Sequence, residues 1–225
     1  MQIVLTPEVL LAAYSQGLFP MAHSGNSEDV HWVCPELRGQ LSITEMHIPK
    51  SLRKIIRQGK IKGVPYEIKI NTDFDGVISA CALETNTRVE TWINPQIKEA
   101  FYQLHKLGFA HSVECWQEGD LVGGLYGMAI GGAFFGESMF SFKTQASKVA
   151  LVHLVARLHG TGYSILDTQF TNEHLEQFGV YEISHEDYME RLESILNKPC
   201  DFNDQSQSEE QRIKQYFDMR YSNKS

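Results

Sequence analysis

Polar side chains interrupt two segments whose residue types otherwise predict buried strands. In the first, residues 133–141 (AFFGESMFS), Glu137 is a carboxylate among large apolar neighbours. Because side chains alternate along a strand, Phe135 and Met139 are expected on the face of Glu137 and Phe134 on the other face. A carboxylate in such a strand is costly to bury without a partner. Glu137 is therefore either a structural anchor, paired with a lysine or a backbone amide, or a functional group.

The second segment, residues 163–169 (YSILDTQ), ends in an acid and an amide. Asp167 and Gln169 are expected on the same face of the strand, roughly 6 to 7 Å apart, where both could reach one small ligand. An Asp at a strand end can also cap the following helix. With Glu137 on a neighbouring strand, the pair predicts a polar cluster.

A third candidate site is a basic stripe in residues 49–58 (PKSLRKIIRQ). Pro49 and Gly59 are typical of a helix start and a helix stop. At 100° per residue four cations share one stripe, namely Lys50, Arg53, Lys54 and Arg57. Like charges at this spacing repel each other. The stripe is therefore either a solvated face or a surface that binds a polyanion.

Residue spacing supports no other kind of site. The four cysteines include no C-x-x-C pair, and the nine histidines include no H-E-x-x-H motif. The glycine-rich strings at 123–127 and 131–136 lack the spacings of phosphate-binding loops, which favours bulges and tight turns. No serine lies in a G-x-S-x-G elbow. We therefore expect neither a metal nor a cofactor.

Helices and strands alternate along the chain in a way that favours an α+β fold. Caps and apolar periodicity predict helices at 7–16, 49–58, 72–83, 95–107, 145–159, 171–178 and 185–196, and strands at 66–71, 110–117, 121–130, 133–141 and 163–169. By analogy the antiparallel meander, helix and following strand are most like an acetyltransferase (GNAT-like) mixed sheet. We expect a small loop-rich N-terminal domain at 1–45 and a larger domain at 46–225, with a loosely held tail from about 197.

The composition is that of an ordinary globular protein, with 225 residues of which 42% are hydrophobic and 21% charged. These values exclude collagen-like and wholly disordered classes. The N-terminus matches no targeting peptide, no apolar run reaches 18 residues, and the cysteines are typical of reduced thiols, so we expect a cytoplasmic protein. The formal charge is −8, but residues 38–62 hold seven Lys or Arg and one acid. Basic and acidic groups are therefore segregated along the chain.

Several strings together are more specific than any one of them. They are AAYSQGLFPM (12–21), W-x-x-P-x-x-R (32–38), TWI (91–93), LHKLGFAHSVECW (104–116), LVGGLYG (121–127), FGESMFS (135–141) and LDTQ (166–169). In order and content they resemble the leucyl/phenylalanyl-tRNA–protein transferase family over nearly the whole chain. This resemblance implies a bacterial cytoplasmic aminoacyltransferase with an acetyltransferase-like C-terminal domain.

The resemblance also implies substrates and site residues. The donor would be aminoacyl-tRNA carrying Leu or Phe, less often Met, and the acceptor the α-amine of a protein with N-terminal Arg or Lys, marked thereby for N-end-rule degradation. By motif position the catalytic residues would be Glu137, Asp167 and Gln169. The aminoacyl pocket would consist of Trp92, Leu125, Phe134, Leu154 and Leu166, and the tRNA-binding cations would be those of the basic stripe. Met21 stands where the family usually has Trp and still offers a soft apolar contact.

Two hypotheses for the carboxylates remain open. In one, Glu137 and Asp167 bind the cationic acceptor and Gln169 positions its α-amine. In the other, Asp167 accepts the amine proton through Gln169. The runner-up functions are a CoA-dependent N-acyltransferase, which the absence of glycine from the junction FKTQASK disfavours, and a non-catalytic tRNA-binding module. We expect a monomer that binds no membrane.

Overall fold

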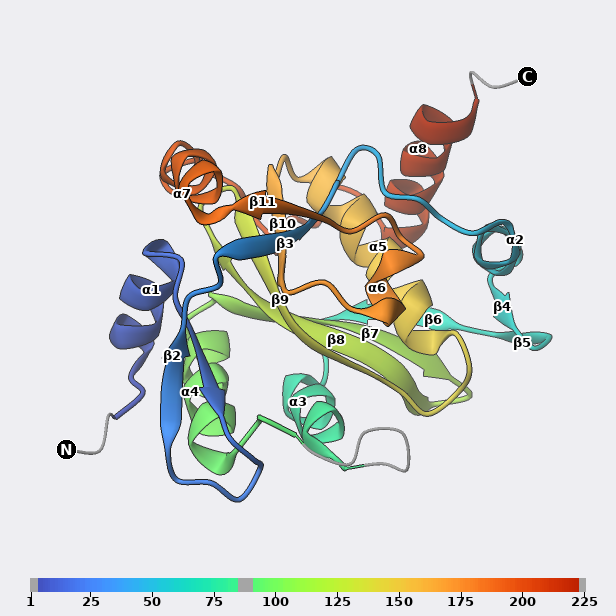
Figure 1. Cartoon of the computed structure of the whole chain (residues 1–225). Helices are drawn as coiled ribbons and strands as arrows, with labels where there is room; N and C mark the ends of the chain where they lie inside the picture. The colour runs from blue at the N-terminus through green and yellow to red at the C-terminus, as the bar shows by residue number, and fades with distance from the viewer. Residues whose placement is uncertain (1–3, 85–90, 223–225) are drawn as a thin grey trace.

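A seven-stranded mixed sheet runs through the centre of the molecule in the computed structural model, which describes residues 4–84 and 91–222 (Figure 1). Across the sheet the strands are β11 (Tyr181–Ser184), β3 (Leu37–Leu41), β10 (Ile165–Gln169), β9 (Ala133–Ser141), β8 (Asp120–Ile130), β7 (Ala110–Gln117) and β6 (Glu67–Ile70). The central pair β9 and β10 is parallel, and all other neighbours are antiparallel. The expected α+β class with a mixed sheet is confirmed.

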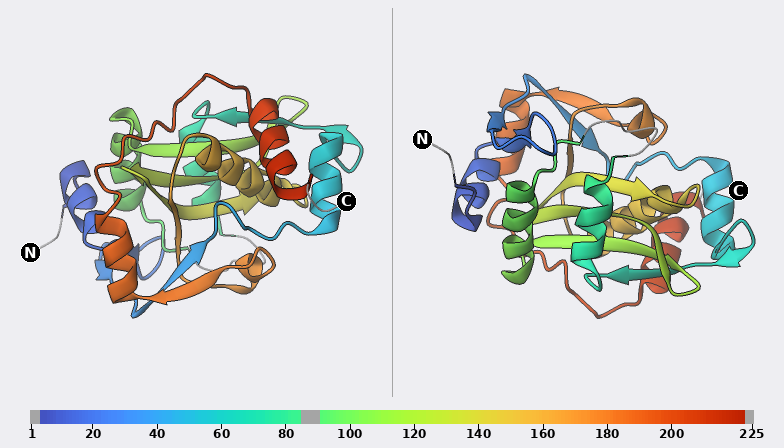
Figure 2. Two further views of the ribbon diagram at one scale, coloured as in Figure 1. Left: turned by 90° about the horizontal axis from the view of Figure 1, so that it is seen from above. Right: turned by 90° about the horizontal axis from the view of Figure 1, so that it is seen from below.

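Helices cover both faces of the sheet and bury a separate apolar cluster on each (Figure 2). On one face lie α5 (Ala146–Gly160), α2 (Lys50–Gln58) and α8 (Glu209–Tyr221); on the other lie α1 (Pro7–Ser15), α3 (Phe74–Ala82), α4 (Pro95–Lys106) and α7 (His185–Glu193). The remaining elements are α6 (Glu173–Glu176) and two small hairpins, β1 (Phe19–Ala22) with β2 (Val30–Val33) and β4 (Lys60–Ile61) with β5 (Val64–Pro65). The result is a three-layer arrangement.

Local capping signals place the helix ends where the sequence predicts them. The Thr6 hydroxyl accepts a hydrogen bond from the Val9 amide at 3.3 Å, and the Asn94 side chain accepts one from the Ile97 amide at 2.8 Å. Gly59 ends α2 in the left-handed conformation, with φ 62°. These groups satisfy backbone donors and acceptors that a helix leaves free at its ends.

The two glycine-rich strings have structural roles, as expected. Gly131 makes the turn between β8 and β9 with φ 55°. At Gly123 on β8, a Cβ atom would lie 2.5 Å from the Ala146 Cβ, so only glycine lets the start of α5 pack this closely on the sheet. The string at 123–127 therefore sets the distance between the sheet and α5.

The expected domain boundary at residue 45 does not follow the sheet. Strand β3 lies between β11 and β10 in the seven-stranded sheet, although the prediction assigned it to the N-terminal unit. Short strands of this kind carry little signal of their own. Strand β3 therefore pairs with strands of the larger expected unit.

The expectation of a loosely held tail is wrong. Ser208 and Gln211 form a capping box that begins α8, and this helix packs against α5. The side chains of Arg212, Tyr216 and Phe217 are buried. The tail is therefore part of the helical layer on the α5 face of the sheet.

Candidate active site between the central strands

A pocket of about 810 Å³ opens where the two central strands stop pairing. The pairing of β9 with β10 ends at Phe135 and Asp167, and the residues that follow on both strands line the pocket. Helix α5 and the segment around α6 supply the other walls. A concave apolar space with a few polar groups at its base is the usual form of a small-ligand site.

Glu137 lies at the base of this pocket because β9 contains a bulge. Tyr126 of β8 pairs with Ser138 and Gly127 pairs with Gly136, which leaves Glu137 as the extra residue. The bulge also corrects the predicted alternation. Beyond it, Met139 joins the cluster on the α5 face, whereas Phe135 lies in the cluster on the opposite face.

Two donors converge on one oxygen of Glu137. The Tyr14 hydroxyl of α1 donates to Oε1 at 2.8 Å, and the Gln169 amide Nε2 donates to the same oxygen at 3.0 Å. Burial raises the pKa of the half-buried Glu137 carboxyl to about 8, and the two hydrogen bonds oppose this rise only in part. The carboxyl therefore exchanges a proton near neutral pH.

Asp167 faces away from the pocket and is fully buried in an ion pair with Arg38. The Arg38 Nε lies 3.0 Å from each carboxylate oxygen, and Nη2 donates to Oδ2 at 2.8 Å. The Tyr188 hydroxyl donates to Oδ2 at 2.7 Å. The Arg38 guanidinium also lies against the rings of Phe19 and Tyr188 and donates to the Gly17 carbonyl. Every strong acceptor direction of Asp167 is thus used within the protein.

The structure corrects the expectation that Asp167 and Gln169 reach one ligand together. A register shift against β3 lies between these two residues, and Gln169 adopts a positive φ of 57°. Such a backbone is strained for a residue other than glycine. The Asp167 carboxylate accepts a hydrogen bond from the backbone N–H of Gln169 at 2.8 Å and so stabilises that backbone conformation. Asp167 therefore positions Gln169, while the Gln169 side chain lies at the pocket.

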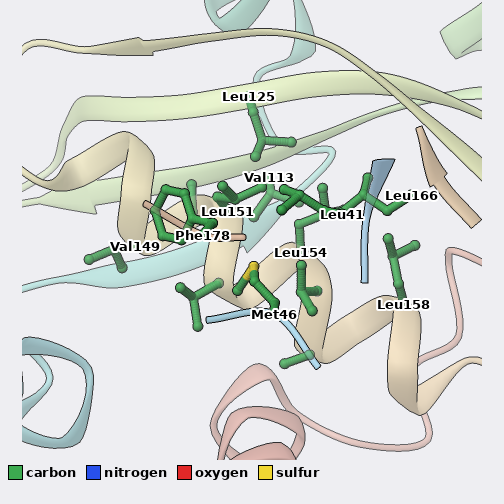
Figure 3. Close-up of a cluster of buried hydrophobic side chains, with 14 of the residues drawn as sticks. Leu41, Met46, Val113, Leu125, Val149, Leu151, Leu154, Leu158, Leu166 and Phe178 are labelled. Atoms are coloured by element: carbon green, nitrogen blue, oxygen red, sulfur yellow. The ribbon is translucent and has the colours of Figure 1, made fainter. Parts of the chain in front are cut away.

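Three of the six residues expected in the aminoacyl pocket line it. Leu125, Leu154 and Leu166 form part of its apolar wall, and Figure 3 shows Leu125 pointing from the sheet toward α5. The other three are not among the described residues that line the pocket: Phe134 stacks on Phe202 in the core, and Trp92 and Met21 pack in the cluster on the opposite face.

Sequence reasoning missed several residues of the pocket wall. Met139 and Phe140 lie in the same string as Glu137, and Leu151 lies one helical turn from Leu154. Their apolar spacing was a usable signal. His174, on the short helix α6, also lines the pocket, and burial lowers its pKa. No pattern in the sequence distinguishes this histidine from the others.

The four cations of the basic stripe lie on α2, away from the pocket base. Lys50 and Lys54 are exposed. Arg57 is exposed too, and Arg53 is partly buried. Both arginines contact α8, with guanidinium carbons 4.5 Å from the Tyr221 ring centroid and 5.8 Å from that of Phe217, respectively. Two of the four cations of the stripe are thus held by aromatic rings of α8.

Metal ligands and membrane helices are not found in the described chain. Within residues 4–84 and 91–222, no group of three or more His, Cys, Asp or Glu side chains could hold a metal ion. The same residues contain no helix that is long and apolar enough to cross a membrane.

Comparison with known proteins identifies the family. The model of the leucyl/phenylalanyl-tRNA protein transferase family matches residues 40–193, and that of its N-terminal domain matches residues 4–36. The chain belongs to this family. Relatives named leucyl/phenylalanyl-tRNA–protein transferase include that of Paramagnetospirillum magneticum, 54% identical over 85% of this chain and 90% of that protein. Those of Maricaulis maris and Caulobacter vibrioides are 51% and 52% identical over 87% and 90% of this chain and 88% and 91% of theirs.

Membership of the leucyl/phenylalanyl-tRNA protein transferase family confirms the predicted resemblance and the prediction of a transferase enzyme. Two solved structures are distantly similar. They are the C-terminal domain of a putative lysylphosphatidylglycerol synthetase from Agrobacterium fabrum (TM-score 0.36, 13% identity, 77% of this chain and 58% of that one) and L-PGS from Bacillus licheniformis (0.37, 14%, 83% and 62%). The family models end at residue 193, so α8 lies beyond the matched region.

Proposed function

We propose that this protein transfers an aminoacyl group from aminoacyl-tRNA to the α-amine at the N-terminus of an acceptor protein. The donors are Leu and Phe, with Met a weaker one, and the acceptors begin with Arg or Lys and become substrates of N-end-rule degradation. The observation that carries the proposal is an apolar pocket with a carboxyl of raised pKa at its base, in a member of this transferase family. We also propose that the enzyme is cytoplasmic and monomeric.

The apolar wall suits the side chain that is transferred. Leu125, Leu154 and Leu166 offer branched aliphatic surface to a Leu or Phe side chain. The pocket volume of about 810 Å³ exceeds what such a side chain needs, which leaves space for the ester and the attacking amine. Donor selection then depends on these three leucines and on Met139.

The chemistry needs alignment more than an enzyme nucleophile. The neutral α-amine attacks the ester carbonyl, the new C–N bond forms, and the C–O bond to the terminal ribose breaks. The ribose hydroxyl leaves with a proton, and the amine loses one. An aminoacyl ester is already activated, so no covalent enzyme intermediate is required. Holding both substrates in place supplies a large part of the rate.

Glu137 and Gln169 are the residues proposed to touch the substrates. A protein α-amine has a pKa of about 7.7 to 8.0, close to the raised pKa of Glu137. Glu137 can therefore bind the α-ammonium group and take up its proton, as a base with a matched pKa does. Gln169 orients this carboxyl through its hydrogen bond. Asp167 acts one step further away, by holding the Gln169 backbone.

The decisive experiment uses the full chain with Leu-, Phe- and Met-tRNA and peptides that begin with Arg, Lys or Ala. We expect the mass of the Arg and Lys peptides to rise by one Leu or Phe residue and the Ala peptide to stay unchanged. Transfer of acetyl from acetyl-CoA without tRNA would instead support the N-acyltransferase. Binding of tRNA without transfer would support the non-catalytic module.

A variant of Glu137 separates two roles for this carboxyl. If it takes up the amine proton, Glu137→Gln lowers kcat by about 10²- to 10⁴-fold, the range of a general base. If it only binds the Arg or Lys side chain of the acceptor, the same variant raises KM for the peptide and leaves kcat unchanged. Steady-state kinetics at saturating Phe-tRNA give both constants.

A further inference from the structure

Helix α8 brings a third arginine to the basic stripe of α2. The Arg220 guanidinium donates to the Thr44 carbonyl at 2.7 Å and to the Met46 carbonyl at 3.0 Å, just before α2 begins. Its carbon lies 5.8 Å from the centroid of the Tyr221 ring, on which Arg53 also rests at 4.5 Å. Two arginines from segments far apart in the sequence are therefore held by one aromatic ring.

These arginines enclose a pocket of about 380 Å³. It is lined by His47, Ile48, Arg53, Arg57, Arg220 and Tyr221. Three guanidinium groups and one imidazole thus surround a single space, and no carboxylate is among its lining residues in the described chain. Asp218 of α8 lines a neighbouring cavity, which Arg57 also lines.

The charge in this pocket is not neutralised within the described residues. Of the ion pairs in residues 4–84 and 91–222, none involves Arg53, Arg57 or Arg220. The Nε atoms of Arg53 and Arg220 are buried and have no hydrogen-bond partner there. Unpaired buried donors on charged groups are costly. The pocket therefore carries positive charge that no described carboxylate compensates.

We propose that this pocket binds a phosphate of the tRNA backbone and that α8, through Arg220, completes the site. The inference rests on the proposed use of aminoacyl-tRNA as donor. A guanidinium presents a planar fork that matches phosphate oxygens, and the stacking rings fix it before the ligand arrives. Lys50 and Lys54 on α2 extend the positive surface to neighbouring phosphates. Contacts of this kind position the tRNA without reading its sequence.

The test measures binding of fluorescein-labelled, uncharged tRNA to the full chain over a range of salt concentrations. Arg220→Gln is expected to weaken binding about tenfold at low salt and to reduce the slope of log K against log salt by about one, the contribution of one phosphate. Arg191→Gln removes one exposed cation from α7, far from α2 in Figures 1 and 2, and is the charge-matched control. It is expected to change K less than about twofold.

Further variants keep the test decisive if Arg220→Gln unfolds the helix. Arg220→Lys retains the charge but not the fork, so it should restore the salt slope without restoring the full affinity. Arg53→Gln removes a second guanidinium from the same pocket and should reduce the slope as Arg220→Gln does. A salt slope unchanged in both glutamine variants would overturn the inference while leaving the proposed function intact.

Two other outcomes also overturn the inference. Inorganic phosphate at millimolar concentration and constant ionic strength that competes with tRNA equally well in the wild-type chain and in Arg220→Gln would show that the tRNA phosphate does not bind in this pocket. Failure of the wild-type chain to bind tRNA at all would remove the proposed function together with this inference.

Discussion

Two carboxyl groups on the central strands of the sheet have opposite environments. Asp167 on β10 accepts hydrogen bonds from Arg38, Tyr188 and the Gln169 amide and is closed off from solvent. Glu137 on β9 has no cation within ion-pair distance among the described residues, and burial raises its pKa to about 8. A paired carboxylate maintains structure, whereas an unpaired one beside a pocket is free to exchange protons with a substrate.

The largest expected effect is the loss of stability when the buried ion pair of Arg38 and Asp167 is broken. Asp167→Asn leaves the Arg38 charge uncompensated in the interior and is expected to lower the free energy of unfolding by about 3–5 kcal/mol. Glu67→Gln, in an exposed pair with Lys69, is the control and should change it by less than about 0.5 kcal/mol. Chemical denaturation at pH 7 measures both. A loss below about 1 kcal/mol for Asp167→Asn would contradict the structural role assigned to this pair.

The unpaired Glu137 carboxyl predicts a free energy of unfolding that decreases as pH rises. Because the folded-state pKa of Glu137 is raised from 4.5 to about 8, the folded protein binds the extra proton between these values. Stability from this group is therefore full at low pH and falls as pH rises toward 8. Between pH 5 and pH 8 we expect the free energy of unfolding of Glu137→Gln to fall by on the order of 3 kcal/mol less than that of the wild type. Chemical denaturation at several pH values measures this difference. If the free energy of unfolding depends on pH in the same way in both proteins, the raised pKa is refuted.

Tyr14→Phe sharpens the comparison by removing one donor from Glu137 alone. The Tyr14 hydrogen bond lowers the pKa of Glu137, so its loss should raise that pKa and move the pH profile of kcat/KM to higher pH. The cost in transfer is expected to be about 1 kcal/mol, or roughly fivefold. Tyr188→Phe removes a donor from Asp167 instead and is the matched control. It should lower stability without moving the profile; equal shifts in both variants would contradict the assignment.

The last expected effect is a change in donor preference, and it concerns the pocket wall. Leu166 lines the pocket, whereas Met21 packs on the opposite face of the sheet. Leu166→Met should change the ratio of Leu to Phe transfer by up to about tenfold, the effect of a methylene in an apolar pocket. Met21→Leu should change it less than about twofold. Competition between Leu-tRNA and Phe-tRNA measures the ratio. A larger change in Met21→Leu than in Leu166→Met would show that Met21 belongs to the pocket.

Much of the local structure could be predicted because its causes are local. The Thr6 and Asn94 caps and the Gly59 stop place helix ends within a few residues. Helix α8 was predictable too, since Ser208 and Gln211 spell a capping box, but the polar composition of the tail outweighed that signal. Strand β3 was not predictable, because its residues join the sheet only through partners far along the chain.

The sequence by itself determined the family, the α+β class and which residues carry polar groups in otherwise apolar strands. Only the tertiary structure decided what those groups do. A bulge at Glu137 and a register shift beside Gln169 reverse the side chains that simple alternation predicts. The partners that separate the two carboxyls, Tyr14 and Arg38, lie more than 100 residues away in the chain. Proton affinity depends on burial and on such partners, and both exist only after the chain has folded.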